Sequence, residues 1–228
     1  MDIHKPKAAH SIREFLIEIG TIVCGILIAL GLEQSLEWAH WREKVNLARE
    51  GLREEIAFDD GFLVQRQKVA DCVARRLSLY ETTIEEATRT GRIGRLPKGD
   101  FTLAGPLDNN QWQSERASQT LTHFPRSEQS DMGRYYSVIE TYKQVWLPAE
   151  DAAWIHLSGL QSGPRAISSQ ELADMRYYLA EARWREAVVV ATAKRNLGFS
   201  ARLKIEPQDR GVGARERVCA GLTPPPAA

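Results

Sequence analysis

One histidine stands where a metal-binding helix would place it. Glu37 and His40 form a Glu-x-x-His pair, which is half of the ligand set of a di-iron carboxylate bundle. The other half needs a second such pair and two further glutamates, and the sequence holds no second pair. We therefore expect no metal site here, and we interpret Glu37 and His40 as polar surface residues. His123 and His156 are interpreted as surface or hydrogen-bonded core residues.

Two glycine-rich segments resemble nucleotide-binding loops without completing them. GRIGRLPKGD, residues 91–100, contains glycine and lysine but lacks the Gly-x-x-x-x-Gly-Lys-Ser/Thr spacing. GVGARE, residues 211–216, lacks the third glycine of a dinucleotide-binding loop and the strand that should precede it. No Gly-x-Ser-x-Gly elbow is present. The sequence therefore predicts no catalytic residues and no cofactor, although a catalytic triad can assemble from distant residues.

Composition and charge are those of a folded protein. The chain has 228 residues, of which 43% are hydrophobic and 26% charged. Its 30 lysines and arginines balance 30 acidic residues, so the basic excess that favours nucleic-acid binding is missing, and we predict no nucleic-acid partner. Three cysteines are too few for a scaffold built on disulfides.

One segment departs from this average. Residues 19–32 contain no charge, and extension back to Phe15 adds Glu18 as the only ionisable residue. A membrane core of about 30 Å needs roughly 20 residues, so a signal peptide and a buried core helix are alternatives. No good cleavage site follows the segment, and Trp38 and Trp41 stand where an interfacial aromatic belt would lie. We predict a transmembrane helix over residues 14–32 that contacts the lipid bilayer.

Basic residues near the two ends of this helix predict its orientation. Lys5, Lys7 and Arg13 precede it, whereas residues 33–41 contain no lysine or arginine. The more basic flank stays in the cytoplasm. We therefore predict a cytoplasmic tail at residues 1–13, with the rest of the chain in the periplasm and the anchor in a bacterial inner membrane. Two basic residues soon after Trp41 reduce the contrast.

Small residues recur along one face of the predicted anchor. Thr21, Gly25 and Ala29 are spaced four apart, which lets two membrane helices approach closely. We expect helix packing through this face. The alternative is that the spacing reflects only the abundance of small residues in membrane helices.

The anchor sequence also resembles a known family. REFLIEIGTIVCGILIALGLEQ, within residues 12–34, is similar to the N-terminal anchor of an uncharacterised family of bacterial single-pass membrane proteins, and DCVARRL at 71–77 is similar to a cysteine-containing stretch in such proteins. The resemblance implies a membrane anchor followed by a helical extramembrane region. It implies no activity, because the family has no assigned function.

Beyond the anchor the hydrophobic period is helical. Apolar residues recur at steps of three and four over residues 70–87, 132–160 and 172–197. Three apolar stripes predict an all-α fold, in which the anchor continues into a long helix packed in an antiparallel three- to four-helix bundle. Helices are expected at about 33–90, 110–122, 126–161 and 168–199, in a periplasmic domain of residues 33–200 followed by a flexible C-terminal tail at 201–228.

Several residues are expected to limit or disturb these helices. Pro148 should kink its helix, and Asp59-Asp60-Gly61 is a candidate break in the first helix. Ser168 and Glu171 have the spacing of a capping box, and Gly198 is expected to end the last helix.

Two tryptophans receive different interpretations. Trp146 fits its apolar stripe and is expected in the core. Trp112 stands in the polar sequence NNQWQSER, so it either packs a connecting segment onto the bundle or contacts a partner or ligand.

The first helix is longer than the others, so its membrane-proximal part is predicted to be a stalk unless the helix bends near Gly61. A stalk would expose Leu47, Leu52 and Ile56 unless another chain covers them. This predicts a homo-oligomer or a larger membrane protein complex.

The cysteines follow from the predicted topology. Cys24 lies in the anchor, which leaves Cys72 and Cys219 as a candidate disulfide in the oxidising compartment. Unpaired thiols and pairing between chains are the alternatives.

These observations favour a non-catalytic, membrane-anchored scaffold or accessory subunit that acts through protein–protein contacts. A periplasmic small-molecule sensor that signals through a partner is the main alternative, because helical bundles can bind ligands between their helices. A membrane-tethered enzyme is the third.

Overall fold

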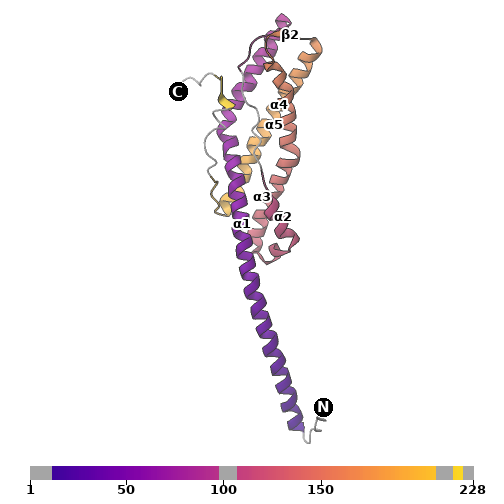
Figure 1. Ribbon diagram of the computed structural model, residues 1–228, viewed down its shortest axis with the longest axis vertical. Coiled ribbons are helices and arrows are strands. Elements are labelled where there is room, and N and C mark those ends of the chain that lie inside the picture. Colours follow the sequence, from indigo (N-terminus) through magenta and orange to yellow (C-terminus); the bar gives the residue numbers. More distant parts are fainter. Residues whose placement is uncertain (1–11, 98–106, 209–217, 223–228) are drawn as a thin grey trace, which may run out of the picture. The chain divides into compact units, whose positions relative to one another are not determined.

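The computed structural model describes residues 12–97, 107–208 and 218–222, and most of these residues are helical (Figure 1). The predicted all-α class is confirmed. The described residues form α1 (Ile12–Thr90), α2 (Asn110–Ala117), α3 (Arg126–Thr141), α4 (Leu147–Leu157) and α5 (Ser169–Arg202), which are all α-helices. A π-helical segment (Tyr142–Trp146) joins α3 to α4, and short 3-10 turns cover Thr120–His123 and Ser158–Gln161. The predicted cytoplasmic tail, apart from its last two residues, and the loop at 211–216 lie outside the described residues.

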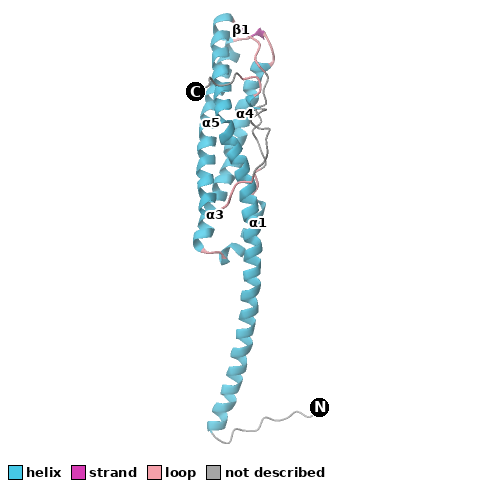
Figure 2. Ribbon diagram, turned by 90° about the vertical axis from the view of Figure 1, so that its left-hand side faces the viewer, coloured by secondary structure: helices cyan, strands magenta, loops and turns pink. Residues whose placement is uncertain are grey.

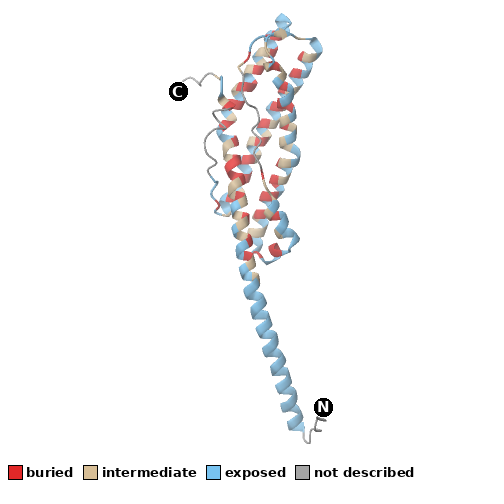
Figure 3. Cartoon of the chain, viewed as in Figure 1, coloured by how far each residue is buried: buried red, intermediate tan, exposed pale blue. Residues whose placement is uncertain are grey.

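The chain divides into two compact units, residues 1–47 and 48–228. In the first unit every residue from 12 to 40 is exposed (Figure 3). The most apolar window of 18 residues in α1 has a mean hydropathy of 2.4, and none of it is buried. By length and composition, this part of α1 can therefore cross a membrane.

The second unit is a bundle in which α3 and α4 run parallel to the part of α1 that belongs to this unit (Figures 1 and 2). The contacts advance in the same direction along both: the Tyr136 hydroxyl meets the carbonyl of Leu52, and the Gln161 amide donates to the Tyr80 hydroxyl at 2.8 Å. The predicted antiparallel arrangement is therefore wrong for α3 and α4 relative to α1. Where the description resumes after α1, the Asp108 N–H donates to Asp59, so α2 and α3 begin beside the earlier part of α1 in this unit.

Helix α5 runs antiparallel to α1, α3 and α4, as predicted. Two ion pairs between α1 and α5 show the direction. Arg66 pairs with Glu186, whereas Glu81, which lies later in α1, pairs with Arg183, which lies earlier in α5. Ser168 caps α5 by accepting a hydrogen bond from the Glu171 backbone at 3.1 Å. The Glu171 carboxylate does not complete the capping box, because it pairs with Arg165. Gly198 lies inside α5 rather than at its end.

The core of the bundle is formed by the stripes that the sequence predicted. Fully buried apolar and aromatic side chains come from α1, α3, α4 and α5 and from the short helical segments that follow α3 and α4. They include Leu52, Ile56, Leu63, Val69, Tyr80, Met132, Tyr135, Ile139 and Leu157. Because Leu52 and Ile56 are covered by their own chain, the prediction that a partner must cover them is wrong. Leu47 remains 63% exposed.

The expected break at Asp59-Asp60-Gly61 does not occur. Helix α1 passes through these residues, and both aspartates are fully buried. Aspartate and glycine disfavour helix interiors by less than about 1 kcal/mol each, and packing on both sides of this point exceeds that cost. The two aspartates are therefore part of the bundle interior.

The helix has a wider, π-helical turn just before Pro148, where a kink was predicted. The π-helical segment ends at Trp146, and Pro148 occupies the first turn of α4, where its missing N–H costs little. A π turn holds more residues than an α turn, so it changes which of the following residues point into the core. Trp146 is consequently only partly buried, contrary to the core position predicted for it, and Glu150 points inward.

Trp112 packs the connecting helix onto the bundle, which agrees with the first of its two interpretations. Its ring stacks on Tyr136 with centroids 4.7 Å apart and an interplanar angle of 11°. This contact fastens α2 to α3.

At the far end of α1, Gly91 adopts a positive φ of 69° and its N–H donates to the carbonyl of Ala87, which ends the helix. The next residues, β1 (Arg92–Ile93), pair antiparallel with β2 (Arg165–Ala166). This two-stranded contact was not predicted. It ties the end of α1 to the segment that precedes α5.

Candidate functional site

A buried arginine shared by two glutamates lies in the middle of the bundle. Nη2 of Arg66 is 2.6 Å from Oε1 of Glu150 and 2.5 Å from Oε2 of Glu186. The three side chains come from α1, α4 and α5 and are 1%, 3% and 9% exposed. Such charges are stable in a protein interior only when they are paired. This cluster therefore joins three helices through one guanidinium group.

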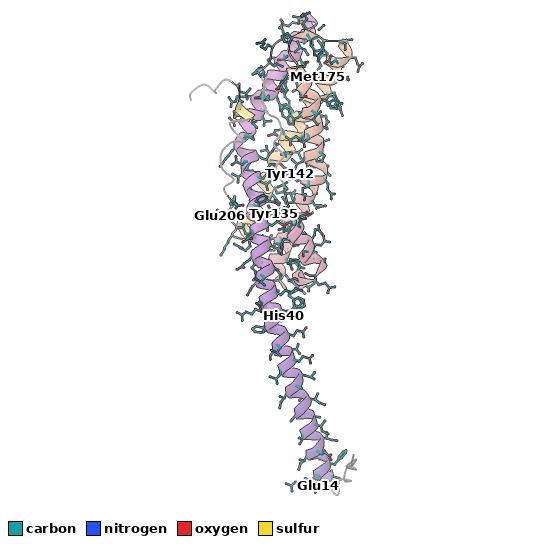
Figure 4. All side chains as sticks on the ribbon, in the orientation of Figure 1. Glu14, His40, Tyr135, Tyr142, Met175 and Glu206 are labelled. Carbon is teal, nitrogen blue, oxygen red and sulfur yellow. A yellow bond between two sulfur atoms is a disulfide. The ribbon has the colours of Figure 1, made fainter. Side chains whose placement is uncertain are left out.

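The electrostatics of this cluster are set by burial and by the single positive charge. Burial disfavours the Arg66 cation, but the two glutamates outweigh this effect and keep its pKa above the ordinary value. Burial raises the pKa of Glu186, against the opposing effect of Arg66. Burial also raises the pKa of Tyr142, which belongs to the π-helical segment and lies beside Arg66 of α1. Figure 4 shows Tyr142 and Tyr135 at successive levels of the bundle.

A second polar group, the aspartate pair Asp59 and Asp60, is buried, and none of the lysines, arginines or histidines that the structure describes forms an ion pair with it. Oδ1 of Asp59 accepts a hydrogen bond from the Asp108 backbone at 2.8 Å, and Oδ1 of Asp60 accepts one from the Tyr135 hydroxyl at 3.0 Å. The other carboxyl oxygen of each aspartate makes no hydrogen bond among the described residues. Burial, followed by the nearby carboxylates, raises the pKa of Asp59 to about 8 despite the hydrogen bond from Asp108. Burial raises the pKa of Asp60 to about 6.

An acidic cleft of about 670 Å³ opens beside these residues, between α1 and the start of α2. Its acidic lining consists of Glu54, Glu55 and Asp108, and Phe58 and Gln208 also face it. A cleft of this lining can hold a small cationic molecule. Among the described residues, no group of three or more histidines, cysteines, aspartates or glutamates has the arrangement of a metal site.

Glu55 also caps α2 from another helix. Its two carboxylate oxygens accept hydrogen bonds from the backbone N–H groups of Gln111, at 2.8 Å, and Trp112, at 3.3 Å. The Asn109 side chain at the usual capping position makes no capping hydrogen bond. Glu55 therefore satisfies the free N–H groups of α2 and complements its dipole.

We expect Glu55→Gln to lower the free energy of unfolding by about 1 kcal/mol, because the negative charge at the start of α2 is lost. Urea unfolding followed by tryptophan fluorescence measures this change. Glu54→Gln is the matched control, because Glu54 is exposed and next in sequence. An equal effect of the two variants would contradict the assigned role of Glu55.

The C-terminal segment is fastened to α1 at two points. The structure joins Cys72 and Cys219 in a disulfide, the pairing expected from the sequence, with Cα atoms 5.2 Å apart. The buried Arg76, one turn further along α1, donates to the carbonyls of Val218 at 3.0 Å and Ala220 at 2.7 Å. The described parts of the predicted flexible tail therefore pack on the bundle.

The second point lies at the end of α5. Arg53 donates to the carbonyls of Leu203 at 2.9 Å and Lys204 at 2.6 Å, and the Gln208 N–H donates to the carbonyl of Ala57 at 2.8 Å. A cation at this end of a helix complements its dipole. These contacts hold residues 203–208 against α1.

The predicted membrane residues all lie on the exposed part of α1. Thr21, Gly25 and Ala29 are exposed, and an added Cβ at Gly25 would meet nothing within 4 Å. The Thr21 hydroxyl donates to the carbonyl of Ile17 at 2.8 Å, so its polarity is satisfied within the helix. Figure 4 shows Glu14 and His40 along this part of the chain.

The two predicted interfacial tryptophans carry basic neighbours. The Arg42 guanidinium lies 5.2 Å from the Trp38 ring centroid, and the Lys44 ammonium lies 4.7 Å from that of Trp41. Cations stack on tryptophan faces in this way, and lysine and arginine near the end of a membrane helix can reach the headgroups. The interfacial position of Trp38 and Trp41 stays a prediction.

Sequence reasoning missed the buried polar residues. Glu186 interrupts the apolar stripe over residues 172–197, and Asp59 and Asp60 were expected only to break the first helix. A signal was present, because a charged residue inside an apolar stripe of a buried helix requires a partner. No sequence pattern indicates which partner that would be.

Comparison with known proteins yields no relative: no family model matches the chain, and neither the curated proteins nor the solved structures contain a significant match.

Proposed function

We propose that this protein is a membrane-anchored scaffold or accessory subunit, with the N-terminus in the cytoplasm and the bundle in the periplasm of a bacterium. The observation that carries the proposal is the first part of α1, where an 18-residue window of mean hydropathy 2.4 has no buried residue. Exposed apolar surface of this length is costly in water and stable in lipid. The resemblance of residues 12–34 to the anchors of uncharacterised bacterial membrane proteins is in keeping with it.

The disulfide supports a periplasmic location for the bundle. Disulfides persist in the periplasm and are rare in the cytosol. The bond between Cys72 and Cys219 therefore favours a periplasmic bundle, and the lysines and arginine before the anchor favour the same orientation.

Exposed aromatic and aliphatic side chains on the bundle support a role in association. Ile155 is 69% exposed, Tyr177 62% and Trp184 50%, on α4 and α5. The Trp184 ring packs edge-on against Trp146, and the Arg185 guanidinium lies 4.4 Å from the Trp184 centroid. Tryptophan and arginine side by side on a surface are typical of protein–protein contacts.

Membrane extraction and protease treatment test the anchor and its orientation. We expect the chain to stay in the membrane fraction after alkaline carbonate extraction and to be digested when protease is added to spheroplasts. A cytosolic marker protein should stay intact in the same sample. Release of the full-length chain by carbonate, or protection of the bundle in spheroplasts, would contradict the proposal.

Photocrosslinking tests the associative role. A photoreactive residue at position 184 should give one discrete product of fixed mass in living cells, and the same residue at Glu85 should not. Glu85 is the control because it lies on an exposed, polar face of the same bundle. Products of equal yield at both positions would indicate nonspecific contact.

The acidic cleft favours a second function, a periplasmic sensor for a small cationic molecule. Its carboxylates face an open volume of about 670 Å³. Saturable binding of a polyamine to the purified chain, lost in Glu54→Gln/Asp108→Asn, would favour the sensor. Absence of saturable binding would leave the scaffold as the better description.

A further inference from the structure

The aspartate pair gives the bundle a feature that its proposed function does not use. Asp59 and Asp60 are 0% exposed, and among the described residues neither forms an ion pair with a lysine, arginine or histidine. An ionised carboxylate in such a position is strongly disfavoured, because burial removes its hydration and supplies no opposite charge.

The buried cations of α1 are engaged elsewhere. Arg66 is shared by Glu150 and Glu186, and Arg76 donates to the carbonyls of the C-terminal segment. Four carboxyl groups and two guanidinium groups are therefore buried among the described residues, and neither cation is paired with the aspartates.

The groups that face the aspartates cannot neutralise them. They are neutral or acidic and come from every element packed at this point: Glu55 on α1, Asp108 before α2, Tyr135 and Tyr136 on α3, and Ser200 on α5. The Tyr135 hydroxyl donates to Asp60 and also meets the carbonyl of Ile56, at 3.3 Å. The aspartates thus lie where α1, α3 and α5 meet, and their charge state affects the packing of all three.

We propose that Asp59 and Asp60 form a proton-dependent lock: the carboxyl groups hold protons while α1, α3 and α5 are packed, and loss of these protons loosens the bundle at this level.

The direction of the effect follows from linkage. A carboxyl that binds its proton more tightly in the folded than in the unfolded chain makes the folded state hold more protons, so the free energy of unfolding falls as pH rises. The fall begins near pH 4, where an unfolded aspartate titrates, and continues through the pKa of about 6 for Asp60 and about 8 for Asp59. The lock is therefore closed in mild acid and opens through neutral to alkaline pH.

The test is urea unfolding of the full chain in detergent micelles from about pH 5 to about pH 9. One carboxyl protonated only in the folded state changes the unfolding constant about tenfold per pH unit. We expect the constant of the wild-type protein to rise at least about tenfold over this range. In Asp59→Asn/Asp60→Asn the rise should be largely lost, whereas Glu85→Gln, which removes an exposed carboxylate from the same helix, should keep it. A flat wild-type profile, or an unchanged rise in the double variant, would overturn the proposal.

A second measurement needs no variant. Infrared spectra of the wild-type protein at neutral pH should contain the carbonyl band of a protonated carboxyl, and this band should disappear in alkali together with the loss of stability. Its absence at neutral pH would overturn the lock even if the double variant does not fold. The unfolding and infrared results do not depend on the membrane topology. Only the inference that the lock responds to external pH rests on the proposed periplasmic location.

Discussion

Replacing Arg66 with leucine should lower the free energy of unfolding by about 3–5 kcal/mol. The substitution leaves Glu150 and Glu186 buried, with 3% and 9% of their side chains exposed, and removes the cation that both contact. Two unpaired carboxyl groups would then have to bind protons or be hydrated within the bundle. Denaturant unfolding followed by tryptophan fluorescence measures the loss.

Two further variants separate a buried pair from an ordinary one. Arg183→Leu breaks the ion pair with Glu81, whose partners are 40% and 43% exposed, and should change stability by less than about 1 kcal/mol. Arg66→Leu/Glu150→Leu/Glu186→Leu removes the whole cluster and should recover much of the stability lost in the single variant. If Arg66→Leu were as mild as Arg183→Leu, the cluster would not be a buried charge network.

Removing the disulfide should have an effect of similar size. Cys72 and Cys219 are 147 residues apart, and closing a loop of this length stabilises a protein by about 5 kcal/mol in the chain-entropy model. Alanine is the replacement of choice in Cys72→Ala/Cys219→Ala, because Cys72 is fully buried and serine would add an unpaired hydroxyl.

Unfolding of the double variant and of the reduced wild-type protein should agree. Cys24→Ala is the matched control, because Cys24 is exposed and unbonded, and its removal should leave stability unchanged. A loss below about 1 kcal/mol would mean that Arg76 and the contacts of residues 203–208 hold the segment without the bond.

The positions of the helices were accessible from sequence because they depend on periodicity. The stripes over residues 70–87 and 132–160 correspond to buried faces of α1 and of α3 with α4, and the predicted limits of the helices lie within a few residues of those observed. Such stripes report burial within one helix. They do not report the direction of one helix relative to another, which is why the parallel packing of α3 on α1 was not predicted.

The candidate site was less accessible because it depends on exceptions to periodicity. A constant helical repeat over residues 132–160 predicts Trp146 in the core and does not predict Glu150 there. The π-helical segment changes the repeat from Tyr142 onward and brings Glu150 to Arg66. No local sequence rule fixes the position of a π turn, because the packing of the surrounding helices decides it.

The disulfide also has a consequence in time. Synthesis proceeds at about 5–20 residues per second, so Cys72 is made roughly 7–30 s before Cys219. During that interval the Cys72 thiol must remain reduced, or be bonded only transiently, because α3, α4 and α5 have not all been synthesised and cannot yet pack on α1. Oxidative closure is thus a late event in biogenesis, and premature pairing of Cys72 with a thiol on another polypeptide is the error that an isomerase would have to correct.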